Sequence, residues 1–160
     1  MEGVESMELK QYTSDDFMLY YALTQHESVM RYITGNALNE DETARKFDKV
    51  MRYNENNRTT GHYRVYFEGK YIGYGKITIS NKEIEVGYML LPAYTGRGLG
   101  KKLLAKLIDY AKKEDTVYVI FAIIQSENDI SRNLLKSFGF QTVAVYEENG
   151  TRCERLELAN

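Results

Sequence analysis

The spacing of hydrophobic side chains along the chain separates helical segments from extended ones. Apolar residues that recur every three or four positions predict an amphipathic helix, and strict alternation predicts a strand with one buried face. Within 99–113, Leu99, Leu103 and Leu107 fall on one helical face. The pattern predicts helices over residues 15–26, 28–33, 39–53, 99–113 and 129–137.

Strands are predicted where the hydrophobic period changes to two. The segment 116–125 is nearly all apolar, which is typical of a strand covered on both faces. Turn residues join neighbouring strands at Glu68-Gly69-Lys70, at Asn81-Lys82 and at Asn149-Gly150. The pattern predicts strands over residues 7–12, 62–69, 70–80, 83–92, 116–125, 141–148 and 151–159.

Two of the predicted helices begin with a recognisable cap. Ser14 precedes two aspartates, which predicts a serine N-cap with acidic residues in the first turn. Asn39 followed by Glu42 is typical of a capping box. Because no linker or internal repeat interrupts the elements, residues 1–160 are predicted to form a single α/β domain with a mixed sheet.

The composition excludes several classes of protein. A net charge of −2 does not support a broad nucleic-acid surface. The longest apolar run, 117–124, is far shorter than a membrane span, and the segment MEGVESMELK lacks the pattern of a signal peptide. A single cysteine, Cys153, excludes an intramolecular disulfide and suits a reducing compartment. We therefore expect a cytoplasmic protein that binds neither nucleic acid nor membranes.

Several chemically active side chains are assigned to packing. Cys153 lies in a strand-like segment with no histidine nearby, and the strand tyrosines, Tyr88 among them, fit half-buried positions. His26 and His62 are isolated, and their surroundings lack metal-ligand spacing. No metal site is expected.

The segment PAYTGRGLGKKLLA, residues 92–105, carries the clearest chemical signal. It follows a predicted strand, and its glycines directly precede a predicted helix. A helix start offers backbone N–H groups without intrahelical partners, and glycines let an anion such as a phosphate approach them. The Rossmann spacing fails because position 101 is lysine, and the P-loop spacing fails at Thr95 and Lys102.

Two motifs resemble those of the GNAT superfamily of acyl-CoA-dependent N-acetyltransferases. The family motif Q/R-x-x-G-x-G/A is similar to Thr95-Gly96-Arg97-Gly98-Leu99-Gly100, with threonine in place of glutamine or arginine. NDISRNLLKSFGF, from Asn128 to Phe140, resembles the family's N-x-x-S/A-x-x-x-Y/L-x-K-x-G-F segment. The N-terminal part resembles the branch of ribosomal-protein N-terminal and polyamine acetyltransferases. The resemblance implies a mostly antiparallel mixed sheet of about seven strands flanked by helices.

The resemblance also implies where coenzyme A binds. In the family, the strand before the glycine turn and the strand after the central helix splay apart, and the pantetheine arm lies between them. Backbone groups of the first strand then bond the pantetheine and polarise the thioester carbonyl. The implied cofactor-binding residues are Met89, Leu90, Leu91, Thr95, Gly96, Arg97, Gly98, Leu99, Gly100, Lys101 and Asn128.

Catalytic residues follow from the same resemblance. Glu85 lies where the family often places a glutamate, and we expect it to act as the general base, directly or through water. Glu83 has the same strand parity and is the alternative base. Many relatives use a tyrosine as the acid, but that position is Leu135 here. Ser131 is then the candidate to protonate or bond the sulfur.

The predicted function is acetyl-CoA-dependent transfer of an acetyl group to a primary amine, by direct attack in a ternary complex. The resemblance suggests a protein N-terminus, a polyamine or another small amine as the acceptor, and allows a homodimer. Leu135 keeps open an alternative, a catalytically silent module that binds or senses acyl-CoA. A nucleotide-binding protein is a third interpretation, which the glycine spacing disfavours.

Overall fold

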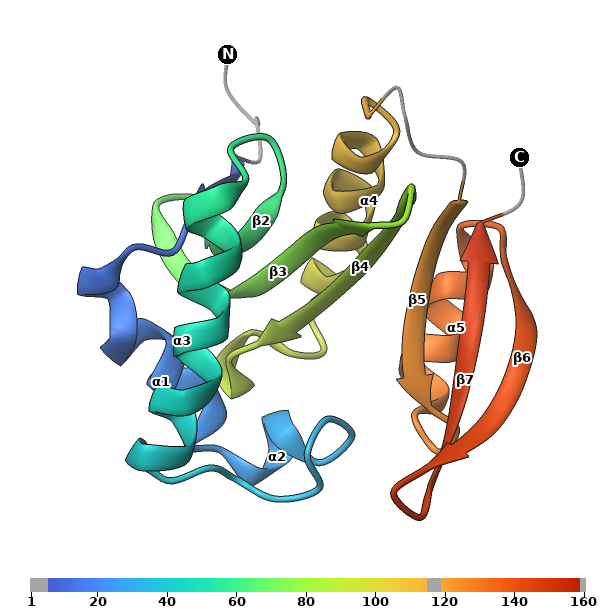
Figure 1. The fold of residues 1–160 in the computed structure, drawn as a ribbon, viewed down its shortest axis with the longest axis horizontal. Helices are drawn as coiled ribbons and strands as arrows, with labels where there is room; N and C mark the ends of the chain where they lie inside the picture. Colours follow the sequence, from blue (N-terminus) through green and yellow to red (C-terminus); the bar gives the residue numbers. More distant parts are fainter. Residues whose placement is uncertain (1–5, 115–118, 159–160) are drawn as a thin grey trace.

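Seven strands form one sheet in the part of the chain that the structure describes. A computed structural model describes residues 6–114 and 119–158 (Figure 1). The strands follow the spatial order β1-β2-β3-β4-β5-β7-β6, and only β4 and β5 are parallel neighbours. Their bounds are β1 Met7–Gln11, β2 Gly61–Phe67, β3 Lys70–Ser80, β4 Glu83–Leu90, β5 Val119–Gln125, β6 Phe140–Glu148 and β7 Thr151–Leu158. The expected α+β fold with a mixed, mostly antiparallel sheet is confirmed.

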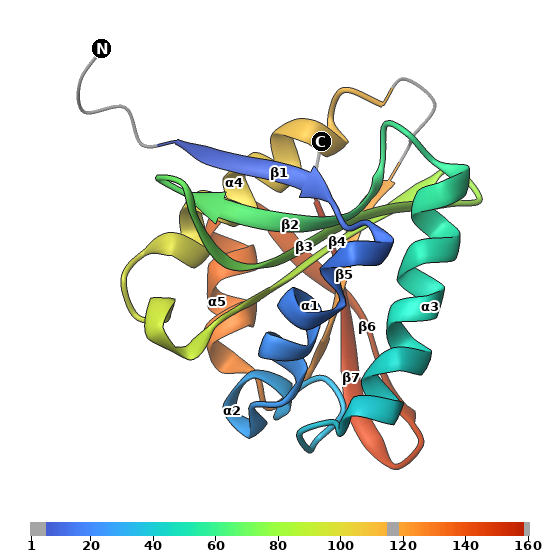
Figure 2. The same cartoon turned by 90° about the vertical axis from the view of Figure 1, so that its left-hand side faces the viewer.

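Helices cover both faces of this sheet. Helices α4 and α5 lie on one face, and α1, α2 and α3 lie on the other (Figure 2). Two short 3₁₀ helices, η1 and η2, precede α1 and α4. The bounds are η1 Ser14–Asp16, α1 Phe17–Thr24, α2 Glu27–Met30, α3 Glu40–Asn56, η2 Pro92–Tyr94, α4 Leu99–Ala111 and α5 Asp129–Ser137.

The helix starts follow the local sequence, with one correction. The capping box of α3 is confirmed, because Asn39 Oδ1 accepts from the Glu42 amide at 2.8 Å and Glu42 Oε1 accepts from the Asn39 amide at 2.9 Å. The predicted cap at Ser14 is wrong. The N-cap is Thr13, whose hydroxyl accepts from the backbone of Asp15. The first three residues of the predicted strand 116–125 lie outside the described residues.

The two faces of the sheet bury different kinds of core. The face under α4 is aliphatic, and Leu103 and Leu107 are fully buried there. The face under α1 and α3 is aromatic, with Tyr12, Tyr20 and Phe47 in mutual ring contact. The apolar face predicted for the helix over residues 99–113 thus packs against the sheet, as expected.

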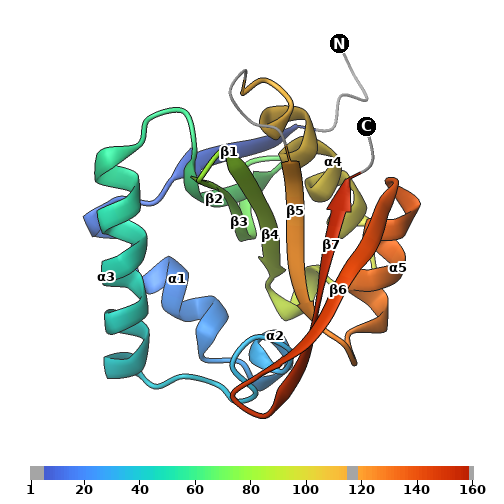
Figure 3. The same ribbon diagram turned by 45° about the vertical axis from the view of Figure 1, so that its right-hand side comes forward.

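The sheet is split between β4 and β5. These strands pair only at their beginnings, through Glu83↔Val119, Ile84↔Ile120 and Glu85↔Phe121. Beyond these pairs they diverge (Figure 1), and Figure 3 shows the same two strands from another side. We call the space between the unpaired ends, residues 86–90 of β4 and 122–125 of β5, the β4–β5 notch. Backbone groups along it have no partner strand, so an extended ligand could take that place.

Candidate active site

The glycine turn before α4 presents bare backbone. Gly96 and Gly98 have φ of +71° and +77°, a left-handed conformation that glycine adopts without strain. A Cβ placed on either glycine would meet no atom within 4 Å. Gly98 is the N-cap of α4, so the first N–H groups of the helix face this open side without intrahelical partners. This arrangement is suited to binding a phosphate.

The side chains of the turn are already engaged. The Thr95 hydroxyl donates to the Pro92 carbonyl at 2.9 Å, and the Arg97 guanidinium lies 5.4 Å from the centre of the Tyr94 ring. Leu99 is buried in the aliphatic core. For Leu99 the backbone N–H is therefore the group available to a ligand. Lys101 is exposed beside the turn.

The end of β4 forms one wall of the notch. The Leu91 amide donates to the Ile72 carbonyl at 2.8 Å and so faces β3. Backbone groups of alternate strand residues point to opposite edges. Leu90 therefore directs its backbone groups toward the notch, and Met89 directs its groups toward β3. The Met89 side chain is buried in the aromatic core.

The start of α5 forms the opposite side. Asn128 is the N-cap of α5, and its Oδ1 accepts from the Ser131 amide at 3.2 Å. Burial raises the pKa of the Tyr88 phenol, and the Ser131 side chain lies near enough to oppose this rise. Leu135, one helical turn further on, is buried in the core. The position of the family's tyrosine therefore holds an apolar core side chain.

The Tyr88 hydroxyl reaches the start of α4 as well. It lies 3.1 Å from the position that a Cβ on Gly100 would take. A phenol on β4 thus sits between the starts of two helices, at the notch. The sequence pattern of β4 predicted only a packing role for Tyr88. Its position near Ser131 depends on how α5 packs against the sheet.

A cavity of about 310 Å³ opens on the notch, on the α1–α3 side of the sheet. We call it the β3–β5 cavity. Its polar lining includes Lys46 from α3, Lys76 from β3 and Glu85 from β4, with Glu148 from the far end of β6. Its apolar lining comes from Tyr20, Tyr32, Ile33, Tyr74, Val86, Met89, Ile123, Ile124 and Cys153. Tyr88 and Gln125 also line it.

Glu85 is the candidate base that lies in this cavity. Its Oε2 is 3.0 Å from Lys76 Nζ, and both side chains are about a quarter exposed, at 26% and 27%. The alternative, Glu83, pairs with Arg155 Nη2 at 3.1 Å and does not line the cavity. The geometry therefore favours Glu85 over Glu83 as the group that a bound acceptor meets.

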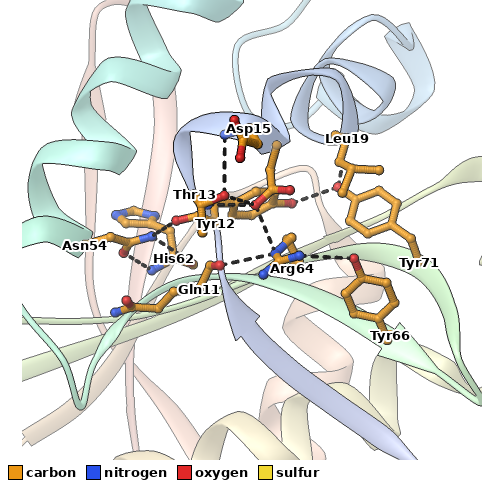
Figure 4. Close-up of polar contacts among 11 residues, drawn as sticks. Gln11, Tyr12, Thr13, Asp15, Leu19, Asn54, His62, Arg64, Tyr66 and Tyr71 are labelled. Atoms are coloured by element: carbon orange, nitrogen blue, oxygen red, sulfur yellow. Dashed lines mark hydrogen bonds and ion pairs between the residues drawn. The ribbon is translucent and has the colours of Figure 1, made fainter.

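A half-buried histidine lies behind the cavity wall. His62 Nδ1 is 2.7 Å from the Tyr74 hydroxyl. Burial, followed by the nearby charges of Lys76 and Lys46, lowers the pKa of His62 to about 4. The imidazole is thus neutral near pH 7. Asn54 of α3 clamps this strand, accepting from the His62 amide and donating to its carbonyl (Figure 4).

Metal-binding clusters and membrane-spanning helices are both absent from residues 6–114 and 119–158. These residues bring no three His, Cys, Asp or Glu side chains together in a way that could hold a metal ion. None of their helices is long and apolar enough to span a bilayer.

Comparison with known proteins identifies the family. Residues 6–141 match the family model described as the acetyltransferase (GNAT) domain. The chain belongs to the GNAT acetyltransferase family. The resemblance drawn from the glycine turn and the Asn128–Phe140 segment is therefore confirmed. Acetyl-CoA fits this family as the co-substrate, and the open glycine turn is compatible with its pyrophosphate.

Two curated GNAT relatives match part of the chain. N-alpha-acetyltransferase RimI of Mycobacterium tuberculosis is 39% identical over 54 residues, which are 34% of this chain and 32% of RimI. L-amino acid N-acyltransferase MnaT of Escherichia coli is 38% identical over 72 residues, which are 45% of this chain and 41% of MnaT. The match spans less than half of either relative.

A solved GNAT structure agrees over nearly the whole chain. It is spermidine N-acetyltransferase from Vibrio cholerae in complex with CoA and spermine. The TM-score is 0.77 at 17% sequence identity, covering 95% of this chain and 93% of that one. At this identity the likeness concerns the fold alone.

Proposed function

We propose that this GNAT protein transfers the acetyl group of acetyl-CoA to a small primary amine, by direct attack within a ternary complex. One observation carries the proposal. The open glycine turn follows the end of β4, and residues of both notch strands line the cavity that holds the Glu85 carboxylate. A phosphate site, unpaired strand edges for an extended arm and a base are thus found along β4 and the turn that follows it.

The coenzyme is held mainly by backbone groups. The N–H groups of Leu99, Gly100 and Lys101 bind the pyrophosphate at the start of α4, where the helix dipole also favours negative charge. The backbone of Leu90 bonds the pantetheine along the notch. Asn128 contributes its Nδ2 from the start of α5. Acetyl-CoA supplies the acyl group.

The protons move through two sites. Glu85 accepts the proton that the amine loses as the C–N bond forms, directly or through one water. The C–S bond breaks, and the sulfur leaves as a thiolate that takes up a proton. Leu135 cannot supply it, so we assign this step to the Ser131–Tyr88 pair. Tyr88 would then assist Ser131 in protonating the thiolate, a role for Tyr88 that the sequence did not indicate.

The relatives support a primary amine as the acceptor class. MnaT is named for an L-amino acid substrate, and the Vibrio cholerae enzyme is named for spermidine. Both compounds carry primary amines. The volume of the cavity, about 310 Å³, is near the lower end of ligand pockets, which favours a small acceptor over a long chain.

The proposal is tested with Glu85→Gln, and Glu83→Gln serves as the matched control on the same strand. Turnover of acetyl-CoA with an amine panel should fall about 10²-fold or more in Glu85→Gln, because positioned bases contribute about that much. Coenzyme A affinity should be retained in both variants, and Glu83→Gln should keep its turnover. Tight acetyl-CoA binding without turnover on any amine would instead support the silent acyl-CoA module.

A further inference from the structure

The lysine wall of the β3–β5 cavity includes an ammonium group without an ion pair among the described residues. Lys46 and Lys76 both line the cavity, from α3 and β3. Lys76 is paired with Glu85, whereas Lys46 has no ion pair with any residue in 6–114 or 119–158. Lys46 is half-buried, and an unpaired ammonium in such a place is held at a cost in free energy.

The two lysines act on the same region. The charge of Lys76 lowers the pKa of Lys46, after burial as the main cause. Both lysines also lower the pKa of the neighbouring His62. The cavity therefore has a positive wall, formed by Lys46 and Lys76, directly beside the carboxylate of Glu85. A second carboxylate, Glu148, lines the cavity from the β6–β7 hairpin.

We propose that the acceptor is a zwitterion of the α-amino acid class, with its carboxylate on Lys46 and Lys76 and its amine at Glu85. This inference rests on the proposed function and narrows its substrate. In an α-amino acid one carbon separates the two charged groups. The cavity offers opposite charges in contact, since Glu85 Oε2 and Lys76 Nζ are 3.0 Å apart. A ligand with adjacent charges matches that pair.

The same wall disfavours a polyamine. A second or third cationic amine would lie near Lys46, and like charges in a half-buried cavity repel more strongly than in water. An amino acid would instead neutralise Lys46. Its side chain would meet apolar surface at Tyr32, Ile33 and Ile123. Neutral and apolar side chains should therefore be accepted more readily than charged ones.

The experiment compares each L-amino acid with its own carboxamide, which keeps the amine and removes the negative charge. We expect kcat/KM for L-methionine to exceed that for L-methioninamide and for spermidine by tenfold or more. Lys46→Gln should lower this acid-over-amide ratio at least tenfold, mainly through KM. Lys46→Arg should restore the ratio. Arg45→Gln, at an exposed position of the same helix, should leave it unchanged.

Two results would overturn the inference while leaving the proposed function intact. One is a higher kcat/KM for the amide or for spermidine than for the amino acid. The other is an equal loss for acid and amide in Lys46→Gln. If no amine is turned over, the proposed function fails, and calorimetry then tests the site alone. L-methionine should still bind protein saturated with coenzyme A, and Lys46→Gln should abolish that binding; absence of binding to the parent protein would refute the site.

Discussion

His62 shows how strongly this fold changes the chemistry of one side chain. In the sequence it is an isolated histidine, with no partner nearby. In the structure it lies against Tyr74 behind the cavity, and two lysines of the cavity wall add positive charge around it. Burial and these charges both disfavour the imidazolium form. The neutral ring can then hydrogen-bond the Tyr74 hydroxyl and orient it in the wall.

We predict that His62 makes stability depend on pH in the acid range. Its pKa falls from the usual 6.5 to about 4 on folding, so between these values the unfolded chain binds more protons than the folded one. The free energy of unfolding should therefore decrease as pH falls from about 6.5 toward 4. In His62→Gln this part of the decrease should vanish, as measured by chemical denaturation at several pH values.

The pKa of His62 can also be measured directly by NMR. The His62 ring resonances should not titrate above about pH 5, given a pKa of about 4. A midpoint above pH 6 would show that the imidazole is not desolvated as the structure implies. Lys46→Gln should raise the midpoint, because it removes one of the charges that lower this pKa.

The start of α4 is the element on which coenzyme binding depends. Its glycines are needed for two separate reasons, a left-handed backbone and an uncovered approach to the helix N–H groups. Only the second reason concerns the ligand. Gly35 allows the two reasons to be tested separately. It also has a positive φ, +90°, and open space around its Cβ position, but it does not lie at the start of α4.

Gly98→Ala and Gly35→Ala should be equally destabilising but differ in ligand binding. Each variant forces alanine into a left-handed conformation, at a cost of about 1–2 kcal/mol in the free energy of unfolding. Gly98→Ala should also weaken coenzyme A binding, because its methyl group projects in front of the α4 start. Gly35→Ala should keep the parent affinity by calorimetry. Equal affinities in the two variants would contradict the phosphate site at this turn.

The split sheet makes the molecule as a whole responsive to the coenzyme. β4 and β5 are joined by three residue pairs in the described chain. The strands on the β4 side come from the first part of the sequence, and those on the β5 side come from the last part. A ligand lying in the notch would contact both sides. It should therefore stabilise the whole chain as one cooperative unit, in keeping with the proposed single domain.

Thermal unfolding should then show one transition that acetyl-CoA and coenzyme A shift upward together. A ligand that binds only the native state stabilises by about 2.7 kcal/mol at one hundred times its dissociation constant. ATP and NAD at the same concentrations should give a much smaller shift, since the glycine spacing fits neither site. Two separate transitions, with the coenzyme shifting only one, would refute the single domain.

Local features of the fold could be predicted from the order of residues. The hydrophobic period defined the strands and helices because side-chain direction in each element is set by the local backbone. The capping box at Asn39 and Glu42 was predictable for the same reason, since both groups lie within one turn. The family and the glycine turn were also recognisable, because their motifs are contiguous.

Features that join distant segments could not be predicted in this way. Lys46, Lys76 and Glu85 come from a helix and two strands, and their meeting in one cavity depends on how α3 packs over the sheet. Leu135 could be seen to replace a tyrosine, but the proximity of Tyr88 to Ser131 depends on the position of α5 relative to β4. Such contacts follow from the packing of the whole core, which no local pattern encodes. The order of residues therefore determined the elements and the coenzyme motif, and the packing determined the charges that an acceptor would meet.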